Sequence, residues 1–182
     1  TVLSEDWYEI RTKDVRSGYL HEKILSTVRD GKKLIITKGT CDFLMKRGND
    51  VMSTRTEYFY EEDENGRPLT ASSRIIQSGG DITTLSVLLK DRILFSQEIA
   101  GKKTEKTIPL PGPDLFLGYY ATRQRMKSSN TVPGTVFKIL SLCAEERGFS
   151  RNQLTFEGKE TAQVRGQTLS LNRFLCLDEE MK

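Results

Sequence analysis

The sequence predicts a mainly β protein of the α+β class, in which one strongly curved antiparallel meander sheet or half-barrel carries one packed helix. The first observation is that residues 51–106 form four segments rich in Thr, Ile, Val, Leu and aromatic residues, separated by short polar turns. Asn65-Gly66 and Gly79-Gly80 supply the positive φ angles of tight hairpins, so neighbouring segments should pair antiparallel. The second is a proline-rich break at residues 109–113, where a ladder of strand hydrogen bonds must end. The length predicts a single domain over residues 1–182.

Further segments of alternating or β-branched residues predict strands on both sides of this run. Gly39 is expected to mark a bulge or bend within one of them, and Gly158 to supply a turn between two others. The expected strands cover residues 7–12, 18–28, 34–46, 51–60, 69–76, 82–89, 92–99, 102–108, 135–143, 152–157, 160–164 and 168–177.

One helix is predicted near residues 114–127. Pro113 suits the first helical position and Asp114 the positive end of the helix dipole. Apolar residues then recur near helical spacing, so an apolar stripe should lie on the sheet.

Charge and composition argue against several classes of protein. Twenty-eight basic and 25 acidic residues leave a net charge of +3, and the two signs are interspersed along the chain. Such mixing is typical of a solvated surface and does not predict a nucleic-acid partner. No run approaches 18 apolar residues, so no transmembrane segment is expected.

The three cysteines, Cys41, Cys143 and Cys176, are widely spaced and form no C-x-x-C pair. Neither a zinc site nor a disulfide framework is therefore predicted. Each cysteine is expected to behave as a small core hydrophobe. One disulfide with one thiol left over remains compatible with the sequence.

Candidate chemistry is sparse. His21 is the single histidine, and it suggests either a general base, a metal ligand or a thiol–imidazole partner of Cys41 or Cys143. A structural or surface histidine is preferred, because Glu22 should point to the opposite face of the strand and nothing local marks a nucleophile. Residues 61–66 resemble the start of a calcium loop, but the twelfth position is Ser72 and the flanks are strands. We therefore predict an acidic hairpin, no catalytic residue, no metal and no cofactor.

Aromatic residues provide the one candidate binding surface. They are expected either to pack in the core or across strands, or to line a ligand or partner face. The candidate residues are Trp7, Tyr19, His21, Tyr58, Tyr60, Phe116 and Tyr120.

Several short motifs carry a resemblance to a known family. They are Trp7-Tyr8-Glu9-Ile10, Ser17-Gly18-Tyr19-Leu20-His21, Asp63-Glu64-Asn65-Gly66-Arg67-Pro68-Leu69, Lys103-Thr104-Glu105-Lys106-Thr107-Ile108-Pro109 and Phe156-Glu157-Gly158-Lys159-Glu160-Thr161. With them the chain resembles a β-rich domain that precedes a transglutaminase-like domain in exported bacterial proteins, and it is similar to uncharacterised families of lipoprotein-carrier type. The resemblance implies a curved antiparallel sheet that closes partly around a helix, and a periplasmic or secreted location. No segment matches a transglutaminase nucleophile motif, so no catalytic residue is carried over.

The sequence thus leads to two main functional hypotheses, with an enzyme that uses His21 as a third. The first is a non-catalytic scaffold or binding domain of a bacterial envelope or secreted protein, associated with an adjacent or partner domain. The alternative is a carrier that holds a lipid or other apolar ligand between the sheet and the helix, which requires an apolar cavity of roughly several hundred Å³. Residues 1–10 have no signal-peptide pattern, and we expect the native start to lie upstream of Thr1.

Overall fold

Eleven strands and one short helix make up the described part of this chain, seen here in a computed structural model. The structure describes residues 1–12, 15–47, 50–77, 80–110, 117–127, 131–144, 146–164 and 167–179. The elements are β1 (Val2–Thr12), β2 (Val15–Arg29), β3 (Lys32–Arg47), β4 (Asp50–Asp63), β5 (Pro68–Gln77), β6 (Ile82–Leu88), β7 (Arg92–Ile99), β8 (Lys102–Pro109), α1 (Tyr119–Lys127), β9 (Val136–Cys143), β10 (Gly148–Val164) and β11 (Gln167–Glu179).

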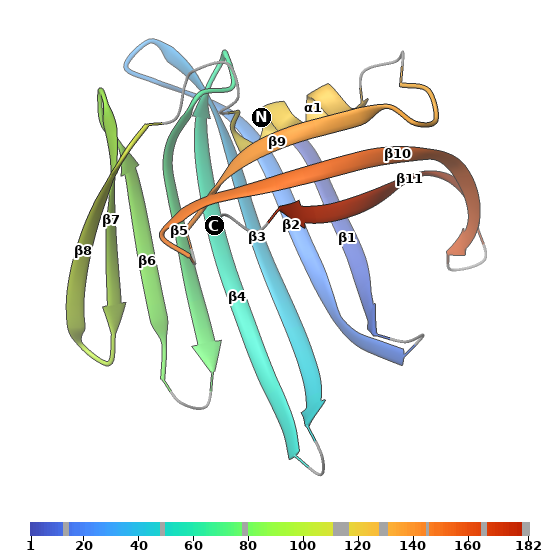
Figure 1. The fold of residues 1–182 in the computed structure, drawn as a ribbon, viewed down its shortest axis with the longest axis horizontal. Helices are drawn as coiled ribbons and strands as arrows, with labels where there is room; N and C mark the ends of the chain where they lie inside the picture. The colour runs from blue at the N-terminus through green and yellow to red at the C-terminus, as the bar shows by residue number, and fades with distance from the viewer. Residues whose placement is uncertain are drawn as a thin grey trace.

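The predicted antiparallel meander is confirmed and is longer than the run that suggested it. Strands β1 to β8 lie side by side in chain order, each antiparallel to the next (Figure 1). Strands β9 to β11 do not continue this sheet. They form a second sheet in the order β11-β10-β9, so the expectation of one sheet is corrected to two.

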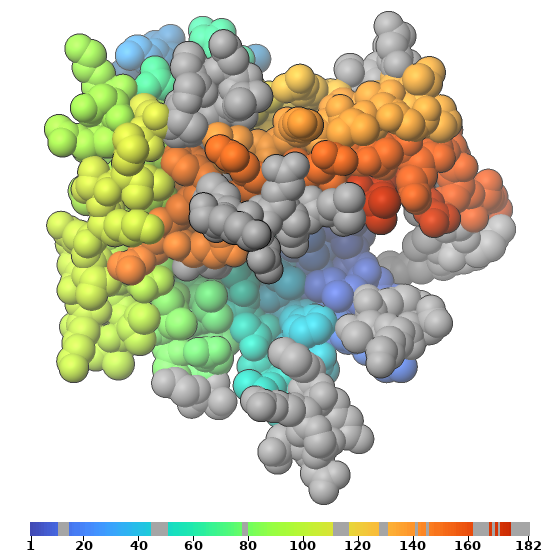
Figure 2. Space-filling model, in the orientation of Figure 1, coloured from blue at the N-terminus to red at the C-terminus, as the bar shows by residue number. Residues whose placement is uncertain are grey.

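The second sheet and the helix cover the same face of the meander. In Figure 1, β9 and β10 cross in front of the meander strands, and α1 lies beside β9 near the upper strand ends. In the same orientation, Figure 2 shows the second sheet over the upper part of the meander, with lower parts of the meander still visible beneath it. We call this covered side the inner face of the meander and the opposite side its outer face.

Alternation along the strands decides which residues meet the inner face. In β2, Glu22 and Ile24 are buried while their neighbours His21 and Lys23 are partly exposed. A period of two is the signature of a sheet with one packed and one solvated face. The inner side of β2 is therefore packed, and its outer side lies in solvent.

The apolar core lies where β5 and β7 of the meander meet β9 and the start of β10. Phe95 and Ile93 from β7 are fully buried against Leu140 and Leu142 from β9 and Phe149 from β10. Burial of side chains of this size contributes about 1.5–3 kcal/mol each. This core fixes the second sheet on the meander, and α1 lies at its margin.

The structure excludes the bulge that was one of two alternatives at Gly39, and it corrects the turn predicted at Gly158. The register of β3 with β2 and with β4 runs through Gly39 without a shift, so no bulge is present there. Gly39 is needed for space: a Cβ atom would lie 2.1 Å from Cζ of Tyr58. Gly158 does not separate two strands. It lies in a β-bulge within the single strand β10, where the register with β11 shifts between Phe156 and Gly158, because the bulge absorbs the extra residue and lets pairing resume.

The helix is shorter at its start than predicted. Leu117 and Gly118 are not helical, and α1 begins at Tyr119 and ends at Lys127. The predicted start signals Pro113 and Asp114 lie outside the described residues. The first turn of α1 is instead set by a carboxylate from the sheet, which is described below.

We expect Gly39→Ala to lower the free energy of unfolding by about 1–3 kcal/mol, because the methyl group must displace the Tyr58 ring. Urea unfolding measures this change. Gly148→Ala is the matched control, since its Cβ atom would meet its nearest neighbour, the Glu146 carbonyl oxygen, at 3.8 Å, an ordinary contact. In a Tyr58→Leu background Gly39→Ala should cost less, and an equal cost in both backgrounds would contradict the steric explanation.

Candidate functional site

A cavity on the inner face of the meander is the candidate site. Its volume is about 260 Å³ and its wall is predominantly apolar. We call it the α1 cavity. Its wall is formed by the helix and the turn before it, by β4 and β5, and by the second sheet, through Tyr60, Glu61, Glu62, Pro68, Thr70, Leu117, Gly118, Tyr119, Thr122, Arg123, Met126, Ile139, Leu142, Asn152 and Leu154.

The carboxylate of Glu62 holds the first turn of α1. It is 1% exposed and accepts hydrogen bonds from the backbone N–H groups of Tyr120 and Ala121. These N–H groups have no partner within a helix, and the positive end of the helix dipole favours a negative charge there. Gly118 allows the close approach, since a Cβ atom on it would lie 2.1 Å from Cδ of Glu62. A residue of β4 thus caps the helix.

A second buried carboxylate, that of Glu22 on β2, holds the side of the helix. It is 1% exposed, forms an ion pair with the guanidinium of Arg123 and accepts a hydrogen bond of 3.0 Å from the hydroxyl of Tyr58. Arg123 also donates to the hydroxyl of Tyr8 at 2.9 Å and lies 3.6 Å from Asp6. Arg123 therefore joins α1 to both β1 and β2.

Two tyrosine residues, Tyr60 and Tyr119, line the α1 cavity, and the ring of Tyr58 packs against both of their rings. The rings of Tyr60 and Tyr119 are stacked with centroids 5.3 Å apart, and Tyr58 is tilted against both. Burial raises the pKa of Tyr58 to about 12, and it also raises the pKa of Tyr119 above its usual value. Both hydroxyls are therefore neutral hydrogen-bonding groups at pH 7.

The acidic hairpin of residues 61–66 uses its carboxylates within the fold. Glu61 accepts two hydrogen bonds from the guanidinium of Arg29, at 3.1 and 2.8 Å. Asp63 accepts from the backbone N–H groups of Asn65 and Arg67, as in an Asx turn. A β-bulge between Glu61 and Glu62 opposite β5 breaks the alternation, which is consistent with burial of both neighbours.

No group of three or more His, Cys, Asp or Glu side chains within the described ranges is arranged to hold a metal ion. Nor does that part of the chain contain a helix with the length and apolar character needed to cross a membrane.

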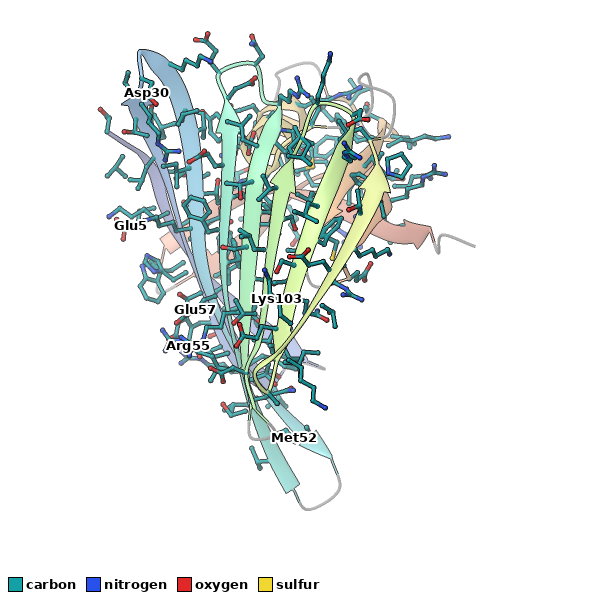
Figure 3. All side chains as sticks on the ribbon, turned by 90° about the vertical axis from the view of Figure 1, so that its left-hand side faces the viewer. Glu5, Asp30, Met52, Arg55, Glu57 and Lys103 are labelled. Atoms are coloured by element: carbon teal, nitrogen blue, oxygen red, sulfur yellow. The ribbon has the colours of Figure 1, made fainter. Side chains whose placement is uncertain are left out.

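The outer face carries a different set of residues. The indole of Trp7 is 65% exposed and stacks on the ring of His21 with centroids 4.1 Å apart, and Tyr19 is tilted against it. His21 Nε2 lies 3.0 Å from an oxygen of Glu5. Figure 3 shows Glu5 and Glu57 on the side of the meander away from the second sheet. This face is open.

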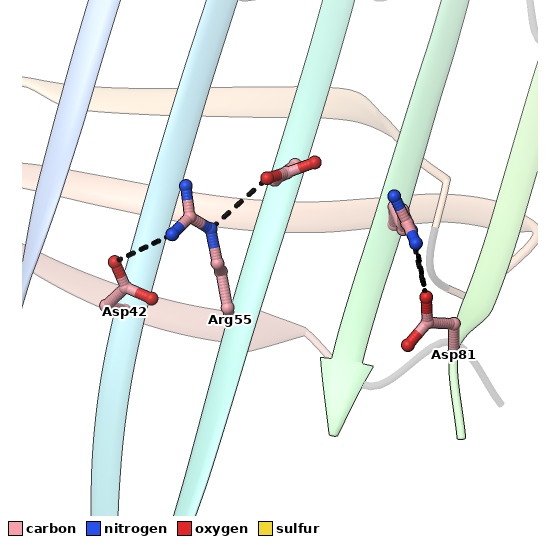
Figure 4. A network of polar contacts seen from close by, with 5 residues as sticks. Asp42, Arg55 and Asp81 are labelled. Carbon is pink, nitrogen blue, oxygen red and sulfur yellow. Dashed lines mark hydrogen bonds and ion pairs between the residues drawn. The ribbon is translucent and has the colours of Figure 1, made fainter. Parts of the chain in front are cut away.

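Ion pairs continue across the outer face. Arg55 lies 3.9 Å from Asp42 and 3.2 Å from Glu57, and Arg74 contacts Asp81 at the edge of β6 (Figure 4). A hydrogen bond to Asp42 raises the pKa of Tyr19. Exposed pairs of this kind contribute roughly 0–1 kcal/mol each, so they describe the surface more than they stabilise it.

The seven predicted site residues fall into separate groups. Tyr60 lines the α1 cavity, the ring of Tyr58 is tilted against that of Tyr60, and Tyr120 lies in the first turn of α1, where its backbone N–H donates to Glu62. Trp7, Tyr19 and His21 lie on the outer face, and Phe116 lies outside the described residues. The residues predicted to form one binding face therefore lie on two different surfaces of the meander.

Three residues that hold the site were missed: Glu22, Glu62 and Arg123. The signal for Glu22 was present, because it occupies an inward position beside Ile24 in an alternating strand, where a charge requires a buried partner. The partner itself could not be identified, since Arg123 lies 101 residues away in the chain. His21 and Cys41 are not brought together. Cys41 pairs in register with Leu20 and His21 with Thr40, so their side chains point to opposite faces.

Comparisons with known proteins do not assign this site. No family model, no curated protein and no solved structure matches the chain. The resemblance to transglutaminase-associated and lipoprotein-carrier-like domains stays a prediction.

Glu62 should make stability depend on pH. Burial raises its pKa above 4.5, its ordinary value, although the helix N–H groups oppose this shift. A group with a raised pKa binds more protons in the folded state, so its contribution is complete below the unfolded value and is lost as pH rises through the folded value. The free energy of unfolding should therefore fall as the pH rises above 4.5. We expect Glu62→Gln to make this fall smaller, as measured by urea unfolding at several pH values. Glu64→Gln, at the exposed hairpin tip, should leave the fall unchanged; if both variants keep the wild-type slope, Glu62 is not its source.

Arg123 should stabilise the fold through Glu22. Arg123→Met leaves a buried carboxylate without its counter-charge, which costs about 3–5 kcal/mol when a buried pair is broken from one side. The double variant Glu22→Gln with Arg123→Met should be more stable than Arg123→Met alone, as measured by urea unfolding. Lys127→Met, which removes an exposed cation from the same helix, should change stability by no more than about 0.5 kcal/mol. A double variant less stable than Arg123→Met would show that the unpaired Glu22 carboxylate is not the reason for the loss of stability.

Proposed function

We propose that this chain is a non-catalytic binding domain that holds an apolar ligand in the α1 cavity. The observation that carries the proposal is the cavity of about 260 Å³, with a predominantly apolar wall, between the meander, α1 and the second sheet. Its place between sheet and helix is the place that the carrier hypothesis requires. Its volume is near the lower end of the roughly 300–1,000 Å³ of ligand pockets, which suits a small ligand.

The polar groups around the cavity support binding over catalysis. Glu62 is bonded to the N-terminus of α1, Glu61 to Arg29 and Arg123 to Glu22. Each charge therefore already has a partner within the fold. These paired charges stabilise the wall, and the surface that the wall presents to the cavity is predominantly hydrocarbon.

The wider setting comes from the sequence resemblance alone. On that basis we place the chain in a bacterial envelope or secreted protein, beside a transglutaminase-like domain. A ligand-holding domain is compatible with such a neighbour, since the chemistry would belong to the neighbour.

A scaffold for a partner domain is the second candidate. The exposed indole of Trp7 on the outer face favours it, together with the position of β1 at the edge of the meander, where among the described strands it pairs only with β2. The two candidates differ at the cavity, because a scaffold requires no ligand there.

Naphthalene is a suitable first probe, because its ten carbon atoms match the cavity volume. We expect it to bind the wild type and to raise the midpoint of thermal unfolding, since a ligand that binds only the folded state stabilises it. Leu154→Trp should weaken binding about tenfold or more by filling the α1 cavity. Isothermal titration calorimetry measures the affinity.

The matched control is Leu85→Trp, at a 45% exposed position of β6, which should bind naphthalene as the wild type does. Circular dichroism confirms that both variants fold. If naphthalene and larger apolar probes all fail to bind the wild type, or if Leu154→Trp binds equally well, the carrier proposal is wrong and the scaffold becomes the better hypothesis.

A further inference from the structure

We propose that β1, at one edge of the meander, binds an extended peptide as an added strand, and that this peptide carries a basic residue on either side of an apolar residue. The apolar residue would lie opposite Trp7, and the basic residues opposite Glu5 and Glu9. No residue of β1 is among the described residues that line the α1 cavity. The proposed surface is therefore separate from that cavity and does not depend on the proposed function.

The backbone of β1 offers hydrogen-bonding groups to an added strand. β1 has 11 residues, whereas a typical strand has about five or six. It stands at the end of the strand order, and among the described strands it pairs only with β2 (Figure 1). In an antiparallel ladder, every second residue of an edge strand directs its N–H and C=O groups away from the neighbouring strand. An extended peptide is the ligand whose own backbone matches such a row.

The two edge strands of the meander differ in how well they are protected against an added strand. β8 exposes three lysines and ends in a proline, which are features of edges that avoid pairing. β1 contains neither lysine nor proline. Four large apolar side chains of β1 are exposed instead: Val2, Leu3, Trp7 and Tyr8. The edge at β8 thus disfavours an added strand, and the edge at β1 favours one.

The indole of Trp7 is the anchor of the proposed surface. Trp7 lies directly opposite His21 in the register with β2, and the two rings are stacked with an angle of 17° between their planes. His21 therefore covers one face of the indole, and the other face is turned away from β2. A side chain directly opposite Trp7 on an added strand would cover this second face. Tryptophan is enriched among the residues that contribute most to protein interfaces.

Carboxylates beside the indole select the charge of the added strand. Glu5 and Glu9 lie two residues before and after Trp7, so they share its face of the sheet, and each side chain is 43% exposed. Hydrogen bonding, first of all from Lys23, lowers the pKa of Glu5 and keeps it ionised at pH 7. Glu9 lies 3.8 Å from Arg16. Because a carboxylate accepts several hydrogen bonds, both can also pair with cations on an added strand.

The same charges disfavour a second copy of this chain as the added strand. Antiparallel pairing of two β1 strands with Trp7 opposite Trp7 would place Glu5 of each copy opposite Glu9 of the other. Like charges directly opposite each other destabilise a sheet. β1 contains three acidic residues and one basic residue, so two copies bring together strands of the same net sign. A basic peptide replaces this repulsion by attraction.

A series of seven-residue peptides tests the proposal, because the register between β1 and β2 is regular from Ser4 to Ile10. The probe is acetyl-Thr-Lys-Thr-Ile-Thr-Lys-Thr-amide, and the control peptide has glutamate in place of both lysines. Trp7 is the single tryptophan of the chain, so tryptophan fluorescence reports binding at this edge. We expect the basic peptide to bind about tenfold more tightly than the acidic one. The net charge of +3 on the chain opposes unspecific attraction of a basic peptide.

Methylation of the peptide backbone distinguishes strand addition from contact through side chains alone. An added strand donates only alternate N–H groups to its neighbour. Two versions of the basic peptide are N-methylated on the two alternate sets of residues. One version should lose binding and the other should keep it, whereas equal affinities would contradict strand addition. In NMR spectra of the protein, the basic peptide should shift backbone amide signals of β1 and leave those of β8 unchanged.

Variants of the protein locate the surface, with affinities measured by fluorescence anisotropy of a dye-labelled peptide. Trp7→Ala should weaken the basic peptide about tenfold, because the anchor is lost. Glu9→Lys should remove most of the preference for the basic over the acidic peptide. Glu105→Lys makes the same change on β8, and this matched control should keep the wild-type preference. Circular dichroism confirms that each variant folds, and the peptide series on the wild type decides the proposal if a variant does not fold.

The outcomes separate this proposal from the proposed function. Trp7→Ala should bind naphthalene as the wild type does, since Trp7 does not line the α1 cavity. If no peptide binds the wild type, or if the acidic peptide binds as tightly as the basic one, the proposed partner is wrong and the cavity is unaffected. If naphthalene fails while the basic peptide binds, the reverse holds.

Two further results would overturn the proposal in favour of another occupant of this edge. Self-association of the chain that Trp7→Ala abolishes, measured by analytical ultracentrifugation without peptide, would identify a second copy. A change in tryptophan fluorescence with a neutral cello-oligosaccharide, and none with the basic peptide, would identify the indole as a surface on which sugars stack.

Discussion

Two buried carboxylates on the inner face of the meander, Glu22 and Glu62, are the constraint on which the candidate site depends. The helix α1 has nine residues and no fully buried side chain, so neither its length nor its packing is sufficient to hold it. Glu62 supplies the acceptors that its first turn needs, and Glu22 binds Arg123 one turn later. The sheet thereby determines where the helix begins and which side faces inward.

This way of attaching the helix explains why a cavity lies beneath it. A helix held by apolar packing presses its side chains into the sheet and excludes free volume. Here the attachments are polar and lie at the first turn and at Arg123, while the core that joins the two sheets lies farther along, around Phe95 and Leu140. The space between these two attachments is lined by the apolar parts of Tyr60, Tyr119, Leu154 and their neighbours. Charges that are satisfied within the fold leave an apolar interior.

The two faces of the meander have different physical characters. The inner face buries carboxylates with dedicated partners, and each of these contacts joins elements far apart in the chain. On the outer face Arg55, Arg74 and their acidic neighbours form exposed pairs that salt screens, beside the stacked rings of Trp7 and His21. Contacts that fix geometry therefore lie on the inner face, whereas the indole of Trp7 on the outer face is exposed to solvent.

The sequence alone determined the strands, their order in the meander and the alternation of faces, because hairpin turns and a period of two are local properties of the chain. Tertiary structure decided the rest. The second sheet, the bulge at Gly158 and the late start of α1 depend on partners that are distant in the chain, and the close approach of Tyr58 explains Gly39. The aromatic residues of the candidate site could be identified from their type, but alternation and folding separated Trp7 and His21 from Tyr58 and Tyr60. Glu22 could be flagged as a charge at an inward position, whereas its pairing with Arg123 across 101 residues could not, because no local pattern encodes which distant residue neutralises a buried charge.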